Sequence, residues 1–474
     1  MLFNSSTFIV FFGCVLFIHY LPIRWQYKKA NLLLASYLFY AAWNPPFVLL
    51  LVISTVVDWT VGRKLYQTNN TTKRKLLLWI SLLCNLGLLG YFKYATFVLD
   101  NFVAALKLMG LEVQFAQMDI ILPVGISFYT FQTLSYTIDI YRKEHAPWNS
   151  FLDYALYVTF FPQLVAGPIV RAFSFLPQCK AFTRASQKEF CWGLYLLLLG
   201  LFQKIVLADA LLGPAADYVY DAQLTPGPLA AWTGTLAFSG QIFFDFAGYS
   251  SCAIGVAICL GFAIPDNFRQ PYAALGFSDF WRRWHVSLSS WLRDYLYVSL
   301  GGNRRGVFRT KLNLMITMLL GGLWHGASWN FVIWGALHGL WLMLERSIPT
   351  QIRGLRIWKH GVGTTLIILL TFTLVSFTWV FFRAQTLEAS LLMAQAMLGL
   401  APSSEPLVLT NVSLYGTWLT VLLLLLVHLA LRNSNLEEMI SKVPWIVRSV
   451  VIAGMLILIT IMPGKENAFI YFQF

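Results

Sequence analysis

Two histidines in apolar sequence are the residues whose chemistry needs an explanation. His325 stands in LLGGLWHGASWNFVIWGALHG, and His285 stands in FWRRWHVSLSSWLRDYLYVSLGGNRRG. An ionisable side chain is costly at membrane depth, so its presence there indicates a function by default. Burial favours the neutral form of an imidazole, which can take a proton from a hydroxyl group. The structural alternative is a histidine that is satisfied by a neighbouring backbone carbonyl.

Three glycines surround His325, and other histidines occur elsewhere. Gly321, Gly322 and Gly326 would let a neighbouring backbone approach closely. His338 lies thirteen residues after His325 and need not share its site, because on a continuous helix it would face another direction. The remaining histidines stand alone near segment ends or in loops and are expected to be structural or interfacial: His19, His145, His360 and His428.

The spacing around His285 predicts one helix with an aromatic face and a polar face. The aromatic face would hold Trp281, Trp284, Leu288, Trp291 and Tyr295. The polar face would hold Arg282, His285, Ser289 and Arg293, with Arg283, Ser287, Ser290 and Asp294 beside it. Two interpretations stay open. The helix either lies on the inner leaflet, which explains the arginines, or lines a polar cavity, which also explains the imidazole.

The composition indicates the class of protein to which the chain belongs. Of 474 residues, 58% are hydrophobic and 12% are charged, against about 25% charged in soluble domains. The sequence therefore predicts an all-α, polytopic membrane protein. Its net charge of +13 lies in loops, which indicates positive-inside topology rather than nucleic-acid binding. The six cysteines show neither a CxxC pair nor zinc spacing, so no disulfide framework and no metal site is expected.

Apolar segments predict about eleven to thirteen membrane-embedded helices in one domain over residues 1–474. The basic residues that follow the first span place the N-terminus outside, and the later alternation places the C-terminus outside as well. Segment 151–170 has basic residues on both sides and contains Pro162, Gly167 and Pro168, so it reads as broken or re-entrant. The charge pattern leaves the topology of residues 142–190 open.

Residues 265–311 are the most charged part of the chain and are expected on the cytoplasmic side. Residues 312–345 are apolar, and the next basic cluster follows them at Arg346, Arg353, Arg356 and Lys359. Two full spans need about 40 residues, and this stretch has 34. The sequence thus predicts a short helical hairpin that carries His325 near its middle.

Several long motifs resemble the membrane-bound O-acyltransferase (MBOAT) superfamily, and within it the branch of bacterial alginate O-acetylation (AlgI-like) proteins. The segments that carry the two histidines, 40 residues apart, come in the order expected of it. The similarity extends to PVGISFYTFQTLSYTIDIYR (123–142), FFPQLVAGPIVR (160–171), FFDFAGYSS (243–251), WVFFRA (379–384) and FIYFQF (469–474). One departure is Ser251, where that branch often has Asp.

The resemblance implies a fold around a central tunnel, with a catalytic core over about 119–345, and assigns roles to individual residues. His325, in the Trp-His-Gly element, would be the principal catalytic residue, and His285 the second, orienting the donor or stabilising the oxyanion. The donor would be acetyl-CoA, entering from the cytoplasm, with no tightly bound cofactor. Its expected contacts are Trp281, Arg282, Arg283, Asn303, Arg304 and Arg305, and the expected tunnel lining is Ser289, Arg293, Asp294, Trp324, Trp329, Asn330 and His338.

The same resemblance implies a partner and a location. A periplasmic or membrane-anchored acetyltransferase would complete transfer onto an exported polysaccharide, and the chain would sit in the bacterial inner membrane among its lipids. Two other classes of function stay open from the residues alone. One is a transporter or flippase, although no second copy of the Trp-His-Gly hairpin is present. The other is a non-catalytic scaffold of an exopolysaccharide machine, which would have no need of two intramembrane histidines.

Overall fold

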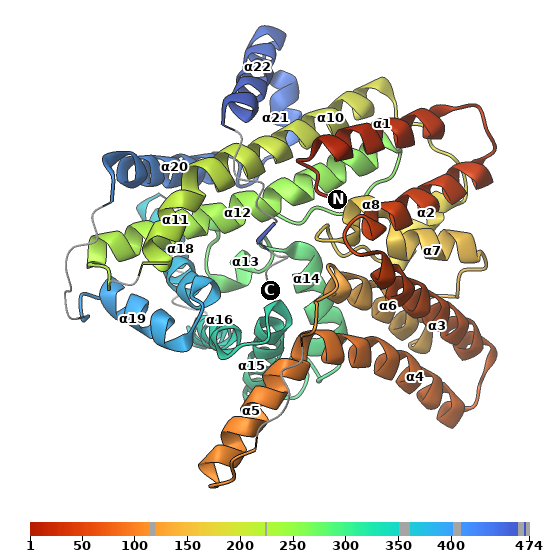
Figure 1. The fold of residues 1–474 in the computed structure, drawn as a ribbon, viewed down its shortest axis with the longest axis horizontal. Coiled ribbons are helices and arrows are strands. Elements are labelled where there is room, and N and C mark those ends of the chain that lie inside the picture. Colours follow the sequence, from red (N-terminus) through yellow and green to blue (C-terminus); the bar gives the residue numbers. More distant parts are fainter. Residues whose placement is uncertain (114–118, 223–224, 350–360, 402–408, 463–468, 471–474) are drawn as a thin grey trace. The chain divides into compact units, whose positions relative to one another are not determined.

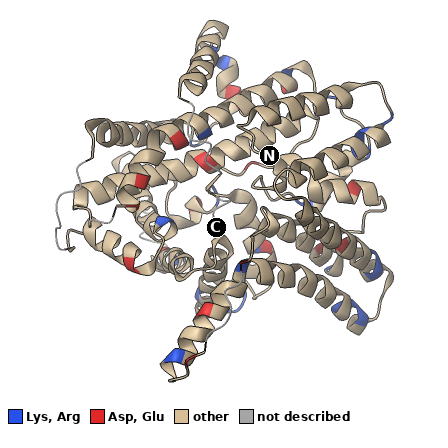
Figure 2. Cartoon of the chain, viewed as in Figure 1, with Lys and Arg blue, Asp and Glu red and all other residues tan. Residues whose placement is uncertain are grey.

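The computed structural model describes residues 1–113, 119–222, 225–349, 361–401, 409–462 and 469–470. Within these ranges every regular element is a helix (Figure 1). Most of each helix carries no charged side chain (Figure 2). The predicted all-α class is therefore confirmed. His360 and three members of the basic cluster after the hairpin, Arg353, Arg356 and Lys359, lie outside the described residues.

Six helical stretches in the described ranges are long and apolar enough to cross a membrane, and a helix pair bent by 119° would make a seventh. The chain is therefore a multi-pass membrane protein. The six stretches are Pro45–Gln67, Thr71–Leu108, Gln187–Tyr220, Pro228–Cys259, Val362–Arg383 and Asn411–Ala430. Other predicted segments are shorter or interrupted: α7 (Phe151–Thr159) ends before α8 (Phe161–Leu164), so segment 151–170 is broken as expected.

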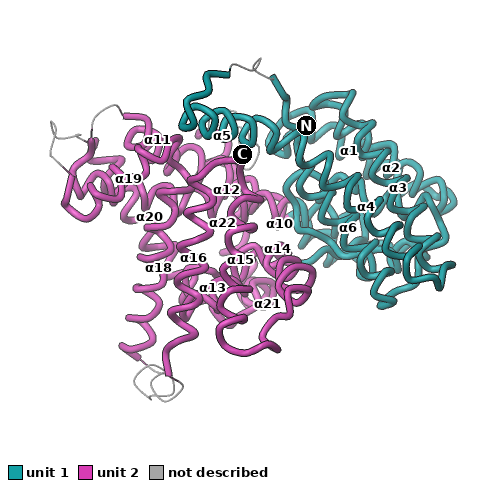
Figure 3. The backbone as a smooth tube through the Cα atoms, turned by 90° about the horizontal axis from the view of Figure 1, so that it is seen from below, with its two compact units in different colours: residues 1–194, 253–265 teal, residues 195–252, 266–474 magenta. Residues whose placement is uncertain are grey.

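The chain forms two compact units, drawn in different colours in Figure 3. One holds residues 1–194 and 253–265, and the other holds 195–252 and 266–474. Both His285 and His325 belong to the second unit. The expectation of a single domain over 1–474 stays a prediction.

The first unit contains a network of buried polar groups that hydrogen-bond to one another. On α3, the buried Asp58 carboxylate accepts hydrogen bonds from Ser81, Asn85 and Thr137. Unpaired polar groups are costly in apolar surroundings, so this network stabilises the contact of three helices. The helices of this unit are α1 (Ser6–Tyr20), α2 (Trp25–Ala41), α3 (Val48–Gln67), α4 (Thr71–Leu89), α5 (Ala95–Leu108), α6 (Ile126–Tyr141), α7, α8, α9 (Ala172–Phe175) and the start of α10 (Gln187–Phe202).

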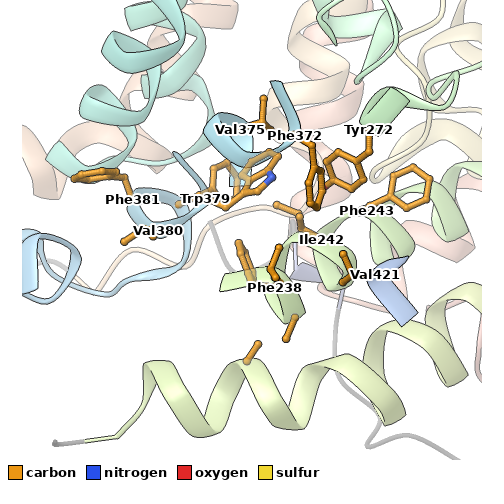
Figure 4. Close-up of a cluster of buried hydrophobic side chains, with 14 of the residues drawn as sticks. Phe238, Ile242, Phe243, Tyr272, Phe372, Val375, Trp379, Val380, Phe381 and Val421 are labelled. Carbon is orange, nitrogen blue, oxygen red and sulfur yellow. The ribbon is translucent and has the colours of Figure 1, made fainter. Parts of the chain in front are cut away.

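The second unit is built around residues 228–252 of α12 (Pro228–Cys259), a single continuous helix. Phe243 of this helix and Phe372 of α18 (Val362–Arg383) pack in one buried cluster with Tyr272 and Trp379 (Figure 4). The remaining helices are α11 (Gly213–Tyr220), α13 (Phe277–Phe280), α14 (Val286–Trp291), α15 (Gly306–His325), α16 (Trp329–Ser347), α19 (Leu387–Met397), α20 (Asn411–Ala430), α21 (Leu436–Lys442) and α22 (Trp445–Ile461). Two π-helical stretches, Gln203–Leu212 and Leu292–Tyr297, extend α10 and α14.

A buried ion cluster ties three parts of this unit together. Lys204 donates to Asp209 at 3.0 Å and also to Asp245 of α12. The backbone N–H of Ile470 donates to the other oxygen of Asp245 at 3.0 Å. Breaking a buried ion pair costs about 3–5 kcal/mol, so this cluster holds the π-helical stretch and the segment at Ile470 on α12.

Helices α15 and α16 form the predicted hairpin, with His325 at the end of the first helix. A methyl group at Gly322 would overlap the carbonyl oxygen of Phe331, and one at Gly335 would overlap that of Met318. A methyl group at Gly326 would overlap the Phe331 ring. The two helices therefore meet backbone to backbone at Gly322 and Gly335. This confirms the expected backbone approach for Gly322, whereas Gly321 and Gly326 face side chains.

Gly335→Ala should lower the stability of this hairpin. Alanine gains up to about 1 kcal/mol of helix propensity over glycine, but overlap with a backbone carbonyl in a packed core costs about 1–3 kcal/mol. We expect a lower melting temperature in detergent. The matched control is Gly454→Ala on α22, where no atom lies within 4 Å of an added methyl group. An equal melting temperature for both variants would contradict the close packing.

Candidate active site

The segment that carries His285 is not one helix, and this prediction is wrong. Helix α13 ends at Phe280, and α14 begins only at Val286. Between them His285 adopts a left-handed backbone with φ +43° and ψ 54°, which costs a residue other than glycine about 1–3 kcal/mol. The N–H of Val286 donates to the carbonyl of Asn267 at 2.9 Å, and the N–H of Arg269 donates to the carbonyl of Arg283 at 2.9 Å. These contacts with a distant segment hold the turn.

The His285 side chain is wholly buried against the same segment. Its Nδ1 lies 3.0 Å from Oδ1 of Asn267, which is also buried. The ring packs edge-on against Phe246, with centroids 4.7 Å apart. His285 lies outside the six long apolar stretches, and burial lowers the pKa of its imidazole to about 3. The ring is therefore neutral at pH 7.

Trp324 contacts both predicted catalytic histidines. Its ring centroid is 6.0 Å from that of His285 and 4.9 Å from that of His325. His325 is buried and also contacts Trp334 at 5.1 Å and Phe382 at 5.2 Å. The structure thus brings the two histidines, 40 residues apart in sequence, into contact with the same indole ring.

His338 and His325 both contact the ring of Trp334. His338 packs on Trp334, with centroids 4.7 Å apart, and its Nε2 lies 3.0 Å from Oγ1 of Thr378. The Thr378 hydroxyl donates its proton to the carbonyl of Val375, so it accepts the hydrogen bond from His338. This is the structural role that the sequence left open for His338.

The other predicted lining residues divide among three environments. Trp281, which was predicted to contact the donor, packs in the aromatic cluster on Trp334 and His338. Asn330 donates to the carbonyl of Ala384 at 2.8 Å and orients the start of α16. The remaining members are less enclosed or bonded locally: Ser289, whose hydroxyl donates to the Trp284 carbonyl, Trp329, which is 54% exposed, and the exposed pair Arg293–Asp294. The predicted polar face shared by His285, Ser289 and Arg293 therefore does not form.

The predicted donor-binding arginines are of two kinds. Arg282, Arg304 and Arg305 are exposed, as is Asn303. Arg283 donates to Asp279 at 3.0 Å and to two backbone carbonyls. Burial raises the pKa of Asp279, but the N–H of Leu275 and the charges of Arg283 and Arg432 outweigh it, so its pKa is lowered. Arg283 thus holds α13 through an ionised carboxylate.

Asn267 is the residue that sequence reasoning missed. It stands in PDNFRQPY, a polar stretch without helical periodicity, where a lone amide carries no recognisable motif. The feature that distinguishes Asn267 is that its side chain is fully buried, which becomes visible only in the structure. No group of three or more metal-ligating side chains occurs in the part of the chain that the structure describes. A groove between α11 and α19 is lined by neither histidine. The tunnel stays a prediction.

Comparison with known proteins identifies the family. The MBOAT, membrane-bound O-acyltransferase family, matches residues 141–382, a range that includes both histidines and Asn267. The chain belongs to the membrane-bound O-acyltransferase family. This MBOAT protein is 42% identical to the probable alginate O-acetylase AlgI of Azotobacter vinelandii, over 84% of this chain and 78% of the relative.

Two further relatives show the range of the family. The MBOAT protein is 35% identical to the peptidoglycan O-acetyltransferase of Helicobacter pylori, over 100% of this chain and 98% of the relative. It is 28% identical to the teichoic acid D-alanyltransferase of Bacillus subtilis, over 55% of this chain and 69% of the relative. The predicted MBOAT membership and its AlgI-like branch are confirmed, and the chain is an O-acyltransferase.

Proposed function

We propose that this O-acyltransferase takes an acetyl group from acetyl-CoA in the cytoplasm and passes it across the bacterial inner membrane for O-acetylation of an exported polysaccharide such as alginate. An extracytoplasmic acetyltransferase partner would complete the transfer. The proposal is supported by the names of two relatives, an alginate O-acetylase and a peptidoglycan O-acetyltransferase. Membership of an acyltransferase family argues against the scaffold and flippase alternatives.

The contact of His285 and His325 with the ring of Trp324 is the observation that carries the chemistry. In the proposed step His325 takes the proton of the attacking hydroxyl, whose oxygen forms a bond to the thioester carbonyl carbon. The carbon–sulfur bond then breaks, and the departing thiolate receives the proton from His325. His285 orients the donor. The aromatic rings around both histidines exclude water, which would otherwise hydrolyse the thioester.

The orientation in the membrane follows from charge. The exposed arginines beside α14 and the basic residues at the start of α4 would face the cytoplasm, and both termini would face the periplasm. The donor would then enter beside Arg304 and Arg305, because coenzyme A carries phosphates and arginine binds phosphate through paired hydrogen bonds. Contact with anionic lipid is the alternative role of these arginines.

His325→Ala should abolish acetyl transfer while protein abundance in the membrane is unchanged. Loss of a general base costs about 10²–10⁴-fold in rate. The measurement is CoA release from radiolabelled acetyl-CoA by the purified protein, together with acetylation of the exported polymer. The matched control is His428→Asn, which removes another buried histidine but keeps an acceptor for the N–H of Tyr272. Wild-type transfer by His325→Ala would refute the assignment.

His285→Ala should cost less than His325→Ala, about 10²-fold, since the proposed role of His285 is orientation of the donor. The same CoA-release assay compares the two variants at equal protein abundance. A His285→Ala variant that released CoA at the wild-type rate would show that this histidine takes no part in the reaction, whatever the result at His325.

Replacing Arg304 and Arg305 together by Gln should raise the KM for acetyl-CoA several-fold, because two phosphate contacts would be lost. The control replaces Lys73 and Lys75 by Gln, which removes two exposed charges from α4. Both variants lose the same charge, so a common effect on topology or lipid contact would appear in both. An unchanged KM in the arginine variant would mean that the donor enters elsewhere.

A further inference from the structure

The amide orientation of Asn267 is fixed by a contact that does not involve histidine. Its Oδ1 accepts the backbone N–H of Ser287 at 3.4 Å and the Ser287 hydroxyl at 2.9 Å. A backbone N–H can only donate, so the atom that receives it is the oxygen. Its Nδ2 donates to Ser250 at 3.2 Å, which agrees with this orientation.

The orientation of Asn267 determines which nitrogen of His285 carries the proton. An amide oxygen accepts and cannot donate, and the neutral ring has one N–H. Because Nδ1 of His285 lies 3.0 Å from this oxygen, the proton sits on Nδ1. Nε2 on the opposite edge of the ring then keeps its lone pair.

Three other buried histidines have the opposite tautomer. Nε2 of His19 lies 3.0 Å from the carbonyl of Leu260, and Nε2 of His338 donates to Thr378, so both carry the proton on Nε2. Nδ1 of His428 accepts the N–H of Tyr272 at 3.3 Å, which again leaves the proton on Nε2. His285 therefore differs from these structural histidines in the nitrogen that it offers to its surroundings.

We propose that Asn267 is a positioning residue, which holds His285 as the Nδ1–H tautomer and so makes its Nε2 a hydrogen-bond acceptor toward the reacting groups. This inference rests on the proposed function and deepens it, because it chooses between the two roles expected of His285. A neutral imidazole with its proton on Nδ1 cannot donate to an oxyanion through Nε2. It can accept an N–H or O–H of the donor or acceptor, which orients that group.

Three features of Asn267 and His285 stabilise the Nδ1–H tautomer. The main-chain carbonyl of Asn267 accepts the N–H of Val286, so the backbone that follows His285 is tied to the same residue as the ring. The side chain of Asn267 is fully buried, so water does not compete for Oδ1. The left-handed conformation of His285 keeps the ring directed at this amide. The titratable side chain across Trp324 is His325.

The tautomer can be observed directly by nitrogen-15 NMR of the purified protein with labelled histidine in detergent at pH 7. The His285 signal is assigned from its loss in His285→Gln. We expect a proton on Nδ1 of His285, whereas His19, His338 and His428 serve as internal references with the proton on Nε2. Asn267→Ala should shift His285 toward the Nε2–H form. A proton on Nε2 of His285 in the wild-type protein would overturn the proposal.

The second test is the pH dependence of acetyl transfer. Asn267→Asp keeps the acceptor but places a carboxylate beside the imidazole, which raises the pKa of His285. Activity that needs neutral His285 is then lost at a higher pH as the solution is acidified, so the acid limb of kcat moves upward. Asn267→Ala should lower kcat on the order of 10–100-fold with KM unchanged.

The matched control is Asn313→Asp, at a buried asparagine of α15 whose side chain donates to the carbonyl of Gly302. It tests the general effect of a new buried carboxylate and should leave the acid limb in place. An acid limb that moves equally in both variants, or in neither, would overturn the role of Asn267. The NMR result does not depend on activity, so an active His325→Ala variant would refute the proposed function and leave the tautomer assignment standing.

Discussion

The hydrogen bond between His285 and Asn267 is the interaction on which the arrangement of the site depends. It joins residues 266–270 to the segment after α13, and the same pair of segments is linked by two backbone hydrogen bonds. The left-handed turn at His285 is unfavourable on its own. It persists because leaving the buried amide and imidazole unpaired would cost more, about 1–3 kcal/mol for each group.

This turn decides what surrounds His325. Because α14 starts only after His285, the imidazole is directed inward and meets Trp324 rather than lying on the surface of a long helix. Trp324 in turn precedes His325 at the end of α15, where glycine contacts with α16 set the position of the hairpin. Backbone packing and one amide thus bring two imidazoles to the same indole. Such enclosure strengthens each polar contact inside it.

The sequence was sufficient for the fold class and the hairpin, because each has a strong local signal, whereas the catalytic role of the two histidines stays a prediction. Apolar length predicts spans, and Gly322 and Gly335 are small residues in a close helical contact. The sequence was insufficient to predict the turn at His285. Residues 281–295 satisfy helical periodicity, and the contacts that break the helix come from Asn267, which no local pattern marks. The partners of Arg283 were hidden for the same reason, since Arg432 lies far along the chain.

The arginines of this segment show that charge counting alone does not identify a binding site. Arg283 and Arg432 share the carboxylate of Asp279, which also accepts the N–H of Leu275. Such a saturated carboxylate fixes α13 in place, so a phosphate would have to displace it to reach Arg283. Arg304 and Arg305, which follow η6 (Leu292–Tyr297), are exposed. The arginines of this segment therefore differ in their surroundings: Arg283 holds the histidine segment, whereas Arg304 and Arg305 are exposed.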